Sequence, residues 1–335
     1  MTLMTLMTLT VAICTRDRPE ELRRALASLR AQTAPPDEIL VVENAPRDNR
    51  VRELIERELP GVRWMPEPVP GLDFARNCAL AAATGDVVAF LDDDAVADPG
   101  WAAALRAPFA DPRVGAVTGR VEALATDTPG QRLVEANGGY SRGLRRVRLP
   151  EEADLPLHGR RAPLIAWAVS VGSGCSLAVR RSLLLEIGGF DEALDLGTEL
   201  PGGGDHDALW RVLEEGASVV YEPAALARHE HRQDLAAAGR QIVGHQRALV
   251  AFLVKSLRRA HGRRRLGILF FLLWRLAKPA VRLARRAGGR DPLPMSLLLH
   301  MLGGCWAGLW AYPAAGRTAA RRRSLFSWSV SHTPS

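Results

Sequence analysis

A run of five apolar residues, Val87 to Leu91, ends abruptly in three consecutive acids, Asp92, Asp93 and Asp94. Such a run is typical of a buried strand in a parallel sheet, and open α/β sheets bind ligands at the carboxyl ends of their strands. Three adjacent carboxylates repel one another unless a cation neutralises them, and oxygen donors suit Mg²⁺ or Mn²⁺. The triplet is therefore a candidate metal site. Taken alone, it is equally well explained as an acidic loop in water.

Strand-like and helical patterns alternate along the first 91 residues. Short apolar runs predict strands, and apolar residues spaced three and four apart predict helices. The predicted strands cover residues 9–14, 39–42, 62–65 and 87–91, and the predicted helices cover residues 20–32, 48–59 and 74–83. This alternation predicts an α/β fold with a doubly wound, mostly parallel sheet and right-handed crossovers.

The four cysteines lie far apart in the sequence, at positions 14, 78, 175 and 305. Their spacing predicts neither a disulfide framework nor a zinc site, so we expect a reducing, cytoplasmic setting. The N-terminal Met-Thr-Leu repeat has no basic segment before its apolar residues, which argues against a signal peptide.

Charge is distributed unevenly along the chain. From Arg240 onward, 18 Lys and Arg residues accompany a single acid, Asp291, whereas the preceding residues contain 26 bases and 36 acids. An acidic body therefore carries a basic tail, and such tails favour polyanionic surfaces. No helix-turn-helix, zinc-finger or RNA-binding signature is evident, so we expect no nucleic-acid partner.

The tail, residues 240–335, also contains two strongly apolar segments. Residues 266–274 are too few to span a bilayer, which needs about 20 apolar residues. Residues 295–315 are long enough, but glycines and Pro313 interrupt them. We expect a basic, Trp-bearing amphipathic segment that lies on an anionic membrane, peripheral on the inner face of the plasma membrane. A helical hairpin packed on the rest of the protein is the alternative.

Seven short motifs occur in a fixed order across residues 9–235. They are residues 11–19 (VAICTRDRP), 40–46 (LVVENAP), 71–77 (GLDFARN), 90–94 (FLDDD), 188–192 (GGFDE), 204–207 (GDHD), and 221–223 (YEP) with His229. Each is weak alone, but together they resemble family 2 glycosyltransferases of the GT-A fold. That resemblance implies a nucleotide-diphosphate sugar as donor, usually with inversion at the anomeric carbon. It divides the chain into a nucleotide-sugar-binding half (1–119), an acceptor-binding and catalytic half (120–239) and the tail.

For the donor, the resemblance implies that Thr15, Arg18 and Glu43 hold the nucleobase at the ends of the first two strands. Family members usually carry Asp at the position of Glu43. Arg76 and Asn77 are expected near the diphosphate, which Arg can bind with two hydrogen bonds. Without the resemblance, Glu43 could cap a turn, and Arg76 could lie on an exposed helix face.

The family's Asp-any-Asp motif falls on Asp92 and Asp94. Asp92 is expected to contact the ribose or the metal, Asp94 to ligate Mn²⁺ or Mg²⁺, and His229 to complete the metal shell. Asp93 is grouped with the donor-binding residues, although a middle residue is expected to point elsewhere. A bound cation would bridge the diphosphate oxygens and stabilise the leaving group.

The resemblance assigns the general base to Asp205, at the start of a predicted helix. An ionised carboxylate is favoured there by free N–H groups and the helix dipole. The family motif reads Glu-Asp, whereas this chain has Gly204 before Asp205. Without the family context, Asp205 is better explained as a helix cap. Because of Gly204, a catalytically inactive scaffold is an alternative to an enzyme that glycosylates a glycan or lipid-linked acceptor.

Overall fold

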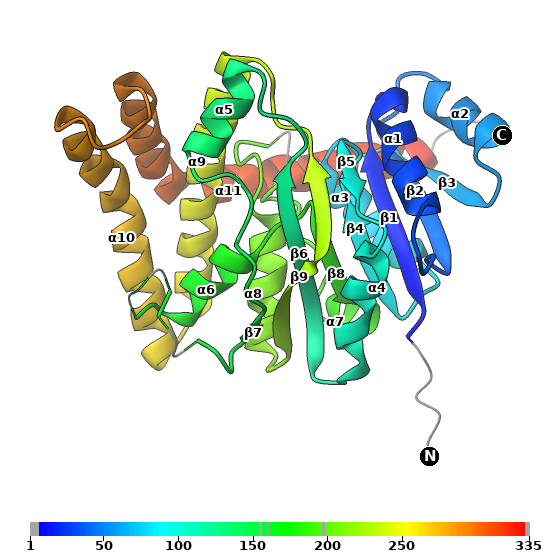
Figure 1. The fold of residues 1–335 in the computed structure, drawn as a ribbon, viewed down its shortest axis with the longest axis horizontal. Helices are drawn as coiled ribbons and strands as arrows, with labels where there is room; N and C mark the ends of the chain where they lie inside the picture. Colours follow the sequence, from blue (N-terminus) through cyan, green and yellow to red (C-terminus); the bar gives the residue numbers. More distant parts are fainter. Residues whose placement is uncertain (1–6, 154–155, 158, 160, 196–197, 332–335) are drawn as a thin grey trace.

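The computed structural model describes residues 7–331 except 154, 155, 158, 160, 196 and 197. Its centre is a nine-stranded sheet in the order β3-β2-β1-β4-β8-β6-β9-β5, with β7 paired to β9. Helices cover both faces of this sheet, as Figure 1 shows. The predicted α/β class is therefore confirmed.

The first half of the sheet is parallel and follows the predicted pattern closely. Its strands are β1 (Leu9–Thr15), β2 (Glu38–Asn44), β3 (Val62–Glu67) and β4 (Val87–Leu91), and its helices are α1 (Pro19–Arg30), α2 (Arg50–Glu58) and α3 (Leu72–Ala82). Apolar periodicity explains this agreement, because Leu22, Leu26 and Leu29 of α1 are buried on one face. Parallel strands of one sheet end at the same edge, so the acids after β4 lie beside the ends of β1 and β2.

The second half of the sheet is mixed. It contains β5 (Ala95–Ala97), β6 (Val114–Ala123), β7 (Val147–Leu149), β8 (Ser176–Arg180) and β9 (Ser218–His229), with α4 (Trp101–Arg106), η1 (Ala107–Ala110), α5 (Pro129–Ala136), α6 (Leu164–Val171), α7 (Arg181–Glu186) and α8 (Gly204–Glu214) between them. Strand β8 runs antiparallel to both β4 and β6, and β5 runs antiparallel to β9. The pairings of β8 with β4 and of β5 with β9 bring residues from the second half to the acidic edge of the first.

The tail forms three helices, α9 (Leu235–Arg259), α10 (Gly262–Ala287) and α11 (Met295–Ser331). Helix α9 belongs to the main core, since Val250, Phe252 and Leu253 are buried in one cluster with residues of α8 and the sheet. Helix α11 runs behind the sheet toward the N-terminal half (Figure 1), where Arg322 donates to the carbonyl oxygen of Pro70. The predicted tail thus packs on the rest of the protein, with α9 in the main core, α10 against α6, α9 and α11, and α11 against α9.

A buried lysine of the tail, Lys255, forms ion pairs with two acids of the preceding chain. Lys255 of α9 donates to Asp191 at 2.5 Å and to Asp207 of α8 at 2.6 Å, and its side chain is 6% exposed. Replacing Lys255 by methionine removes the cation that the two carboxylates share, and Asp207 keeps only Arg211. We expect the free energy of unfolding of Lys255→Met to fall by roughly 3–5 kcal/mol, measured by urea denaturation. Arg258→Met, at an exposed position of the same helix, should change it by no more than about 0.5 kcal/mol. A loss below about 1 kcal/mol in Lys255→Met would contradict this account.

Candidate active site

The acidic triplet lies at the carboxyl edge of the sheet and binds residues from the end of β1. Asp93 accepts from the hydroxyl of Thr15 at 2.7 Å and from Arg18 at 2.6 Å, and Arg18 also donates to Asp94 at 3.0 Å. Burial raises the pKa of Asp93 to about 7, against the attraction of Arg18. Thr15 and Arg18 therefore bind the acidic triplet. The side chain of Asp93, the middle acid, points toward these two residues.

His229 reaches the same edge through the pairing of β5 with β9, which sets Ala95 opposite His229. Its Nε2 lies 3.1 Å from Asp94 and 4.0 Å from Asp92. Burial opposes the charged imidazole, but the hydrogen bond to Asp94 and the charges of Asp94 and Asp92 together outweigh burial and raise the pKa of His229. Burial likewise opposes ionisation of Asp94, yet His229 and Arg18 hold its pKa well below the usual range. The three predicted metal ligands are therefore together.

Cys175 is a neighbour of this group that the sequence analysis did not single out. Ligand atoms of Asp92, Cys175 and His229 all lie within 4.8 Å of one another. The antiparallel pairing of β4 with β8 explains this, because Leu91 faces Ser176 and the next positions are Asp92 and Cys175. Burial raises the pKa of the Cys175 thiol well above its ordinary value, so the thiol stays protonated. A protonated thiol is a poor ligand, whereas the carboxylates and imidazole fit Mn²⁺ or Mg²⁺.

Arg76 lies inside the site rather than on an exposed helix face. Its guanidinium donates to Asp73 at 3.0 Å, lies 3.8 Å from Asp92 and stacks over the ring of Phe190. Burial opposes its charge, but Asp73 and Asp92 raise its pKa further, so the cation is permanent. Asn77 has a different setting, because its amide donates to the carbonyl of Phe190 and accepts from the Phe190 N–H. Asn77 therefore fixes the segment around Phe190.

Glu43 is buried at the end of β2. One carboxylate oxygen accepts from the indole N–H of Trp64 at 3.0 Å, and the other has no hydrogen-bond partner among the described residues. Burial raises the pKa of Glu43 above its usual value, although the bond from Trp64 opposes this. A buried acceptor without a partner costs free energy unless another group donates to it. This arrangement differs from the cap of a turn.

Asp205 is the second residue of α8, and the helix cap is Gly203 instead. Its carboxylate accepts from the backbone N–H of Gly174 at 2.8 Å and from that of His206 at 2.8 Å. Burial opposes ionisation, but His206 and Arg76 hold the pKa of Asp205 far below its ordinary value. The carboxylate is therefore ionised at neutral pH, as a general base must be.

Close packing at Gly174 brings Arg76 and Asp205 together. A Cβ atom at Gly174 would lie 2.7 Å from a guanidinium nitrogen of Arg76 and 3.2 Å from a carboxylate oxygen of Asp205. Arg76 in turn lies beside Asp92, so a fixed cation lies between the acidic triplet and the ionised Asp205. Such an arrangement can bind an anionic group with its cations and accept a proton at its carboxylate.

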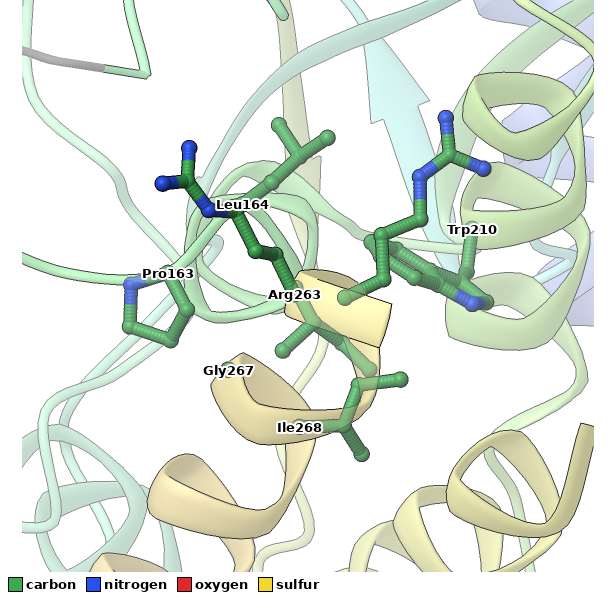
Figure 2. Close-up of a pocket in the computed structure, with 8 residues that line it drawn as sticks. Pro163, Leu164, Trp210, Arg263, Gly267 and Ile268 are labelled. Carbon is green, nitrogen blue, oxygen red and sulfur yellow. The ribbon is translucent and has the colours of Figure 1, made fainter. Parts of the chain in front are cut away.

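A cavity of about 250 Å³ lies between α6, α8 and α10 (Figure 2). The residues that line it are Pro163, Leu164, Ile165, Trp210, Arg263, Arg264, Gly267 and Ile268. Its lining contains two guanidinium groups and is otherwise apolar, so it lacks the carboxylates that distinguish the site at the sheet edge.

A protein-family model described as glycosyl transferase family 2 matches residues 10–188 of this chain. The chain belongs to glycosyl transferase family 2. The matched segment contains the ends of β1, β2 and β4, with Arg76 and Cys175. Asp205 and His229 lie beyond it, and the structure brings both of them to the same edge.

Two curated relatives of this family 2 enzyme match part of its sequence. The pre-mycofactocin glycosyltransferase of Mycobacterium tuberculosis is 35% identical over 162 residues, which cover 48% of this chain and 30% of the relative. The succinoglycan biosynthesis protein ExoM of Rhizobium meliloti is 31% identical over 118 residues, or 34% of this chain and 38% of the relative. The matched segment spans about a third of each relative's length.

Two solved structures share its fold. The mannosyltransferase PcManGT from Pyrobaculum calidifontis, in complex with GDP-Man and Mn²⁺, superposes with a TM-score of 0.57 at 20% identity, covering 94% of this chain and 87% of that one. GalNAc-T7 with UDP, GalNAc and Mn²⁺ superposes with a TM-score of 0.52 at 15% identity, covering 87% and 59%. These likenesses confirm the GT-A fold of the family 2 enzyme.

Proposed function

We propose that this enzyme transfers a sugar from a nucleotide-diphosphate sugar to an acceptor hydroxyl, with inversion at the anomeric carbon. The observation that carries the proposal is the meeting of Asp92, Asp94 and His229 with the buried Arg76 and the ionised Asp205 at one sheet edge. Two structures of the same fold contain a nucleotide or nucleotide sugar with Mn²⁺, which supports the same class of donor.

The donor half supplies binding and charge. Asp92, Asp94 and His229 would hold Mn²⁺ or Mg²⁺, and the bound ion would offset the charge of the diphosphate as it leaves. Arg76 adds a fixed guanidinium, which suits a diphosphate oxygen. The free acceptor atom of Glu43 can take a hydrogen bond from an N–H of the nucleobase.

The acceptor half supplies the base. Asp205 takes the proton from the acceptor hydroxyl while the oxygen forms its bond to the anomeric carbon. The bond between that carbon and the diphosphate oxygen breaks, and the diphosphate departs with its electron pair. A single displacement from the opposite face inverts the anomeric centre. General-base help of this kind is worth about 10²–10⁴-fold in rate.

The test is a screen of nucleotide-diphosphate sugars for an increase in the midpoint temperature of unfolding. A specific ligand stabilises the folded state by about 2.7 kcal/mol at 100 times its dissociation constant. We expect an increase for one nucleotide class that requires Mn²⁺ or Mg²⁺. No increase with any donor, in the presence of either cation, would contradict the proposal.

The acceptor is proposed to be a glycan or a lipid-linked sugar, in cell-surface polysaccharide or glycolipid synthesis. The printed name of one relative refers to succinoglycan biosynthesis, which supports a polysaccharide product. The tail supports a membrane location, because α10 exposes Leu266, Phe270 and Leu273, spaced on one helix face. Trp306 and Trp310 of α11 are also exposed, and each packed helix thus keeps an outward apolar surface.

We place this surface on the inner face of the plasma membrane, as a peripheral contact. Arg263, Arg264 and Arg265 in the first turn of α10 lie next to the apolar residues, and basic residues beside an apolar face favour anionic lipid. Among the residues that the structure describes, no helix is long and apolar enough to cross a bilayer.

The membrane contact is tested on the full-length protein with vesicles that contain phosphatidylglycerol. Because each exposed apolar side chain contributes roughly 1.5–3 kcal/mol when buried, Phe270→Ser combined with Leu273→Ser should weaken sedimentation with vesicles at least ~10-fold. Leu144→Ser removes an equally exposed leucine from a loop and should leave binding unchanged. Binding that survives the double substitution, or that ignores salt, would argue against this surface.

A further inference from the structure

Gly204, the first residue of α8, has no room for a side chain. A Cβ atom at this position would lie 1.8 Å from Oδ2 of Asp73 and 2.7 Å from its carboxyl carbon. The backbone of Gly204 is not among those with positive φ, so conformation does not demand glycine here. The space that a side chain at 204 would occupy is filled by the carboxylate of Asp73, which comes from α3.

Asp73 is held in an unusual position for an acid. It is 1% exposed, and one of its oxygens accepts from Arg76 at 3.0 Å. The other oxygen, Oδ2, has no hydrogen-bond partner among the described residues. Burial raises the pKa of Asp73 well above its usual value, and Arg76 opposes this. A buried polar group of this kind costs free energy unless its contacts offset that cost.

Asp73 determines where the guanidinium of Arg76 lies. One terminal nitrogen of Arg76 is bound to Asp73, and the other is 3.8 Å from Asp92. That second nitrogen also borders Gly174, whose N–H binds Asp205. The guanidinium therefore lies between Asp92, which follows β4, and Asp205 in the first turn of α8. Asp73 binds the guanidinium from the remaining side.

We propose that Asp73 is a positioning residue, which provides from α3 the carboxylate that α8 lacks at position 204 and fixes Arg76 for the donor diphosphate. The role of Arg76 rests on the proposed function. The carboxylate of Asp73 occupies the space of a side chain at position 204, and this part of the proposal rests only on packing. The packing and the positioning of Arg76 are therefore tested separately.

The first test measures stability in the full-length protein and needs no ligand. Gly204→Asp should lower the midpoint temperature of unfolding, because two side chains then claim one volume. The same substitution in an Asp73→Ala background should lower it far less, or raise it, since the space is then open. An equal decrease in the midpoint temperature in both backgrounds would contradict the idea that Asp73 occupies the space of a side chain at position 204.

The second test measures Mn²⁺-dependent binding of UDP and GDP by calorimetry. Hydrogen bonds to charged groups are worth roughly 1.5–3 kcal/mol, so Asp73→Ala should weaken the nucleotide that the wild type binds by about 10–100-fold. Asp73→Asn, which keeps the shape of the side chain, should also weaken it. The double variant Asp73→Ala with Gly204→Asp should recover most of the affinity. The matched control, Asp73→Ala with Gly204→Asn, should restore the packing around position 204 but not the affinity for the nucleotide.

The outcomes separate the two proposals. Absence of Mn²⁺-dependent binding of both nucleotides in the wild type would overturn the proposed function. Wild-type binding that persists unchanged in Asp73→Ala and Asp73→Asn would overturn the role of Asp73 alone. Equal recovery by Asp and Asn at position 204 would show that space rather than charge matters, and would also overturn it.

Discussion

Replacement of Asp205 by asparagine is expected to slow sugar transfer by about 10²–10⁴-fold, because the amide has the same shape but cannot take a proton. An amide oxygen can keep the bond from the Gly174 N–H, whereas the bond from the His206 N–H to the other carboxylate oxygen is lost. Stability should therefore fall by only about 1 kcal/mol, and the binding of donor should change little. The measurement is single-turnover transfer with donor saturating.

Asp207 provides the contrast for this prediction. It lies two residues further along α8, is buried, and is bonded to Lys255 and Arg211. Its substitution should mainly lower stability, whereas Asp205→Asn should mainly lower the rate of transfer. Transfer within a few-fold of wild type in Asp205→Asn would assign the base elsewhere.

Replacement of Asp94 by alanine is expected to abolish Mn²⁺-dependent binding of the nucleotide. Asp94 is the acid closest to His229, at 3.1 Å, and it also holds Arg18. Loss of a carboxylate removes a charged ligand that neither Cys175 nor water replaces with equal strength. Calorimetric titration of UDP and GDP, with Mn²⁺ and with chelator, measures the effect.

Asp86→Ala is the matched control for Asp94→Ala. Asp86 precedes β4 and bonds to Thr8 at the opposite edge of the sheet, so its loss should leave nucleotide binding intact. Wild-type affinity in Asp94→Ala, or in excess chelator, would show that the triplet holds no metal needed for the donor.

The first half of the fold could be predicted from the sequence because its signals are local. Apolar runs and helical spacing define β1 to β4 and α1 to α3, and parallel topology then places their carboxyl ends together. Asp92, Asp94 and Glu43 follow from that rule. Their individual contacts, such as the engagement of Arg18 by Asp93 and Asp94, depend on side-chain packing that no local pattern encodes.

The second half could not be derived in the same way because its pairings are long-range. Cys175 reaches the site only through the antiparallel pairing of β4 with β8, and runs of apolar residues do not reveal strand direction. The roles of Gly174 and Asp73 depend on contacts between separate segments, since Gly174 meets Asp205 31 residues away and Asp73 meets Gly204 131 residues away.

The burial of the tail helices could not be predicted from composition. Its composition predicted basic, apolar helices, and α9 to α11 are helices. Composition does not reveal which side of each helix is buried, and α9 proves to share the main core through Val250, Phe252 and Leu253. Substitutions on the exposed face of α10 therefore test membrane binding better than deletion of the tail, which would expose that core.

Release of nucleoside diphosphate tests most directly whether the residues at the carboxyl edge of the sheet activate a nucleotide-diphosphate sugar. Purified full-length protein is incubated with a panel of nucleotide sugars and Mn²⁺, with and without glycan or lipid-linked acceptors, and the nucleoside diphosphate is quantified by chromatography. We expect release from one donor that requires the cation, increases with an acceptor and is lost in Asp94→Ala. No release from any donor, as an inactive scaffold would give, or equal release in Asp94→Ala, would contradict the account.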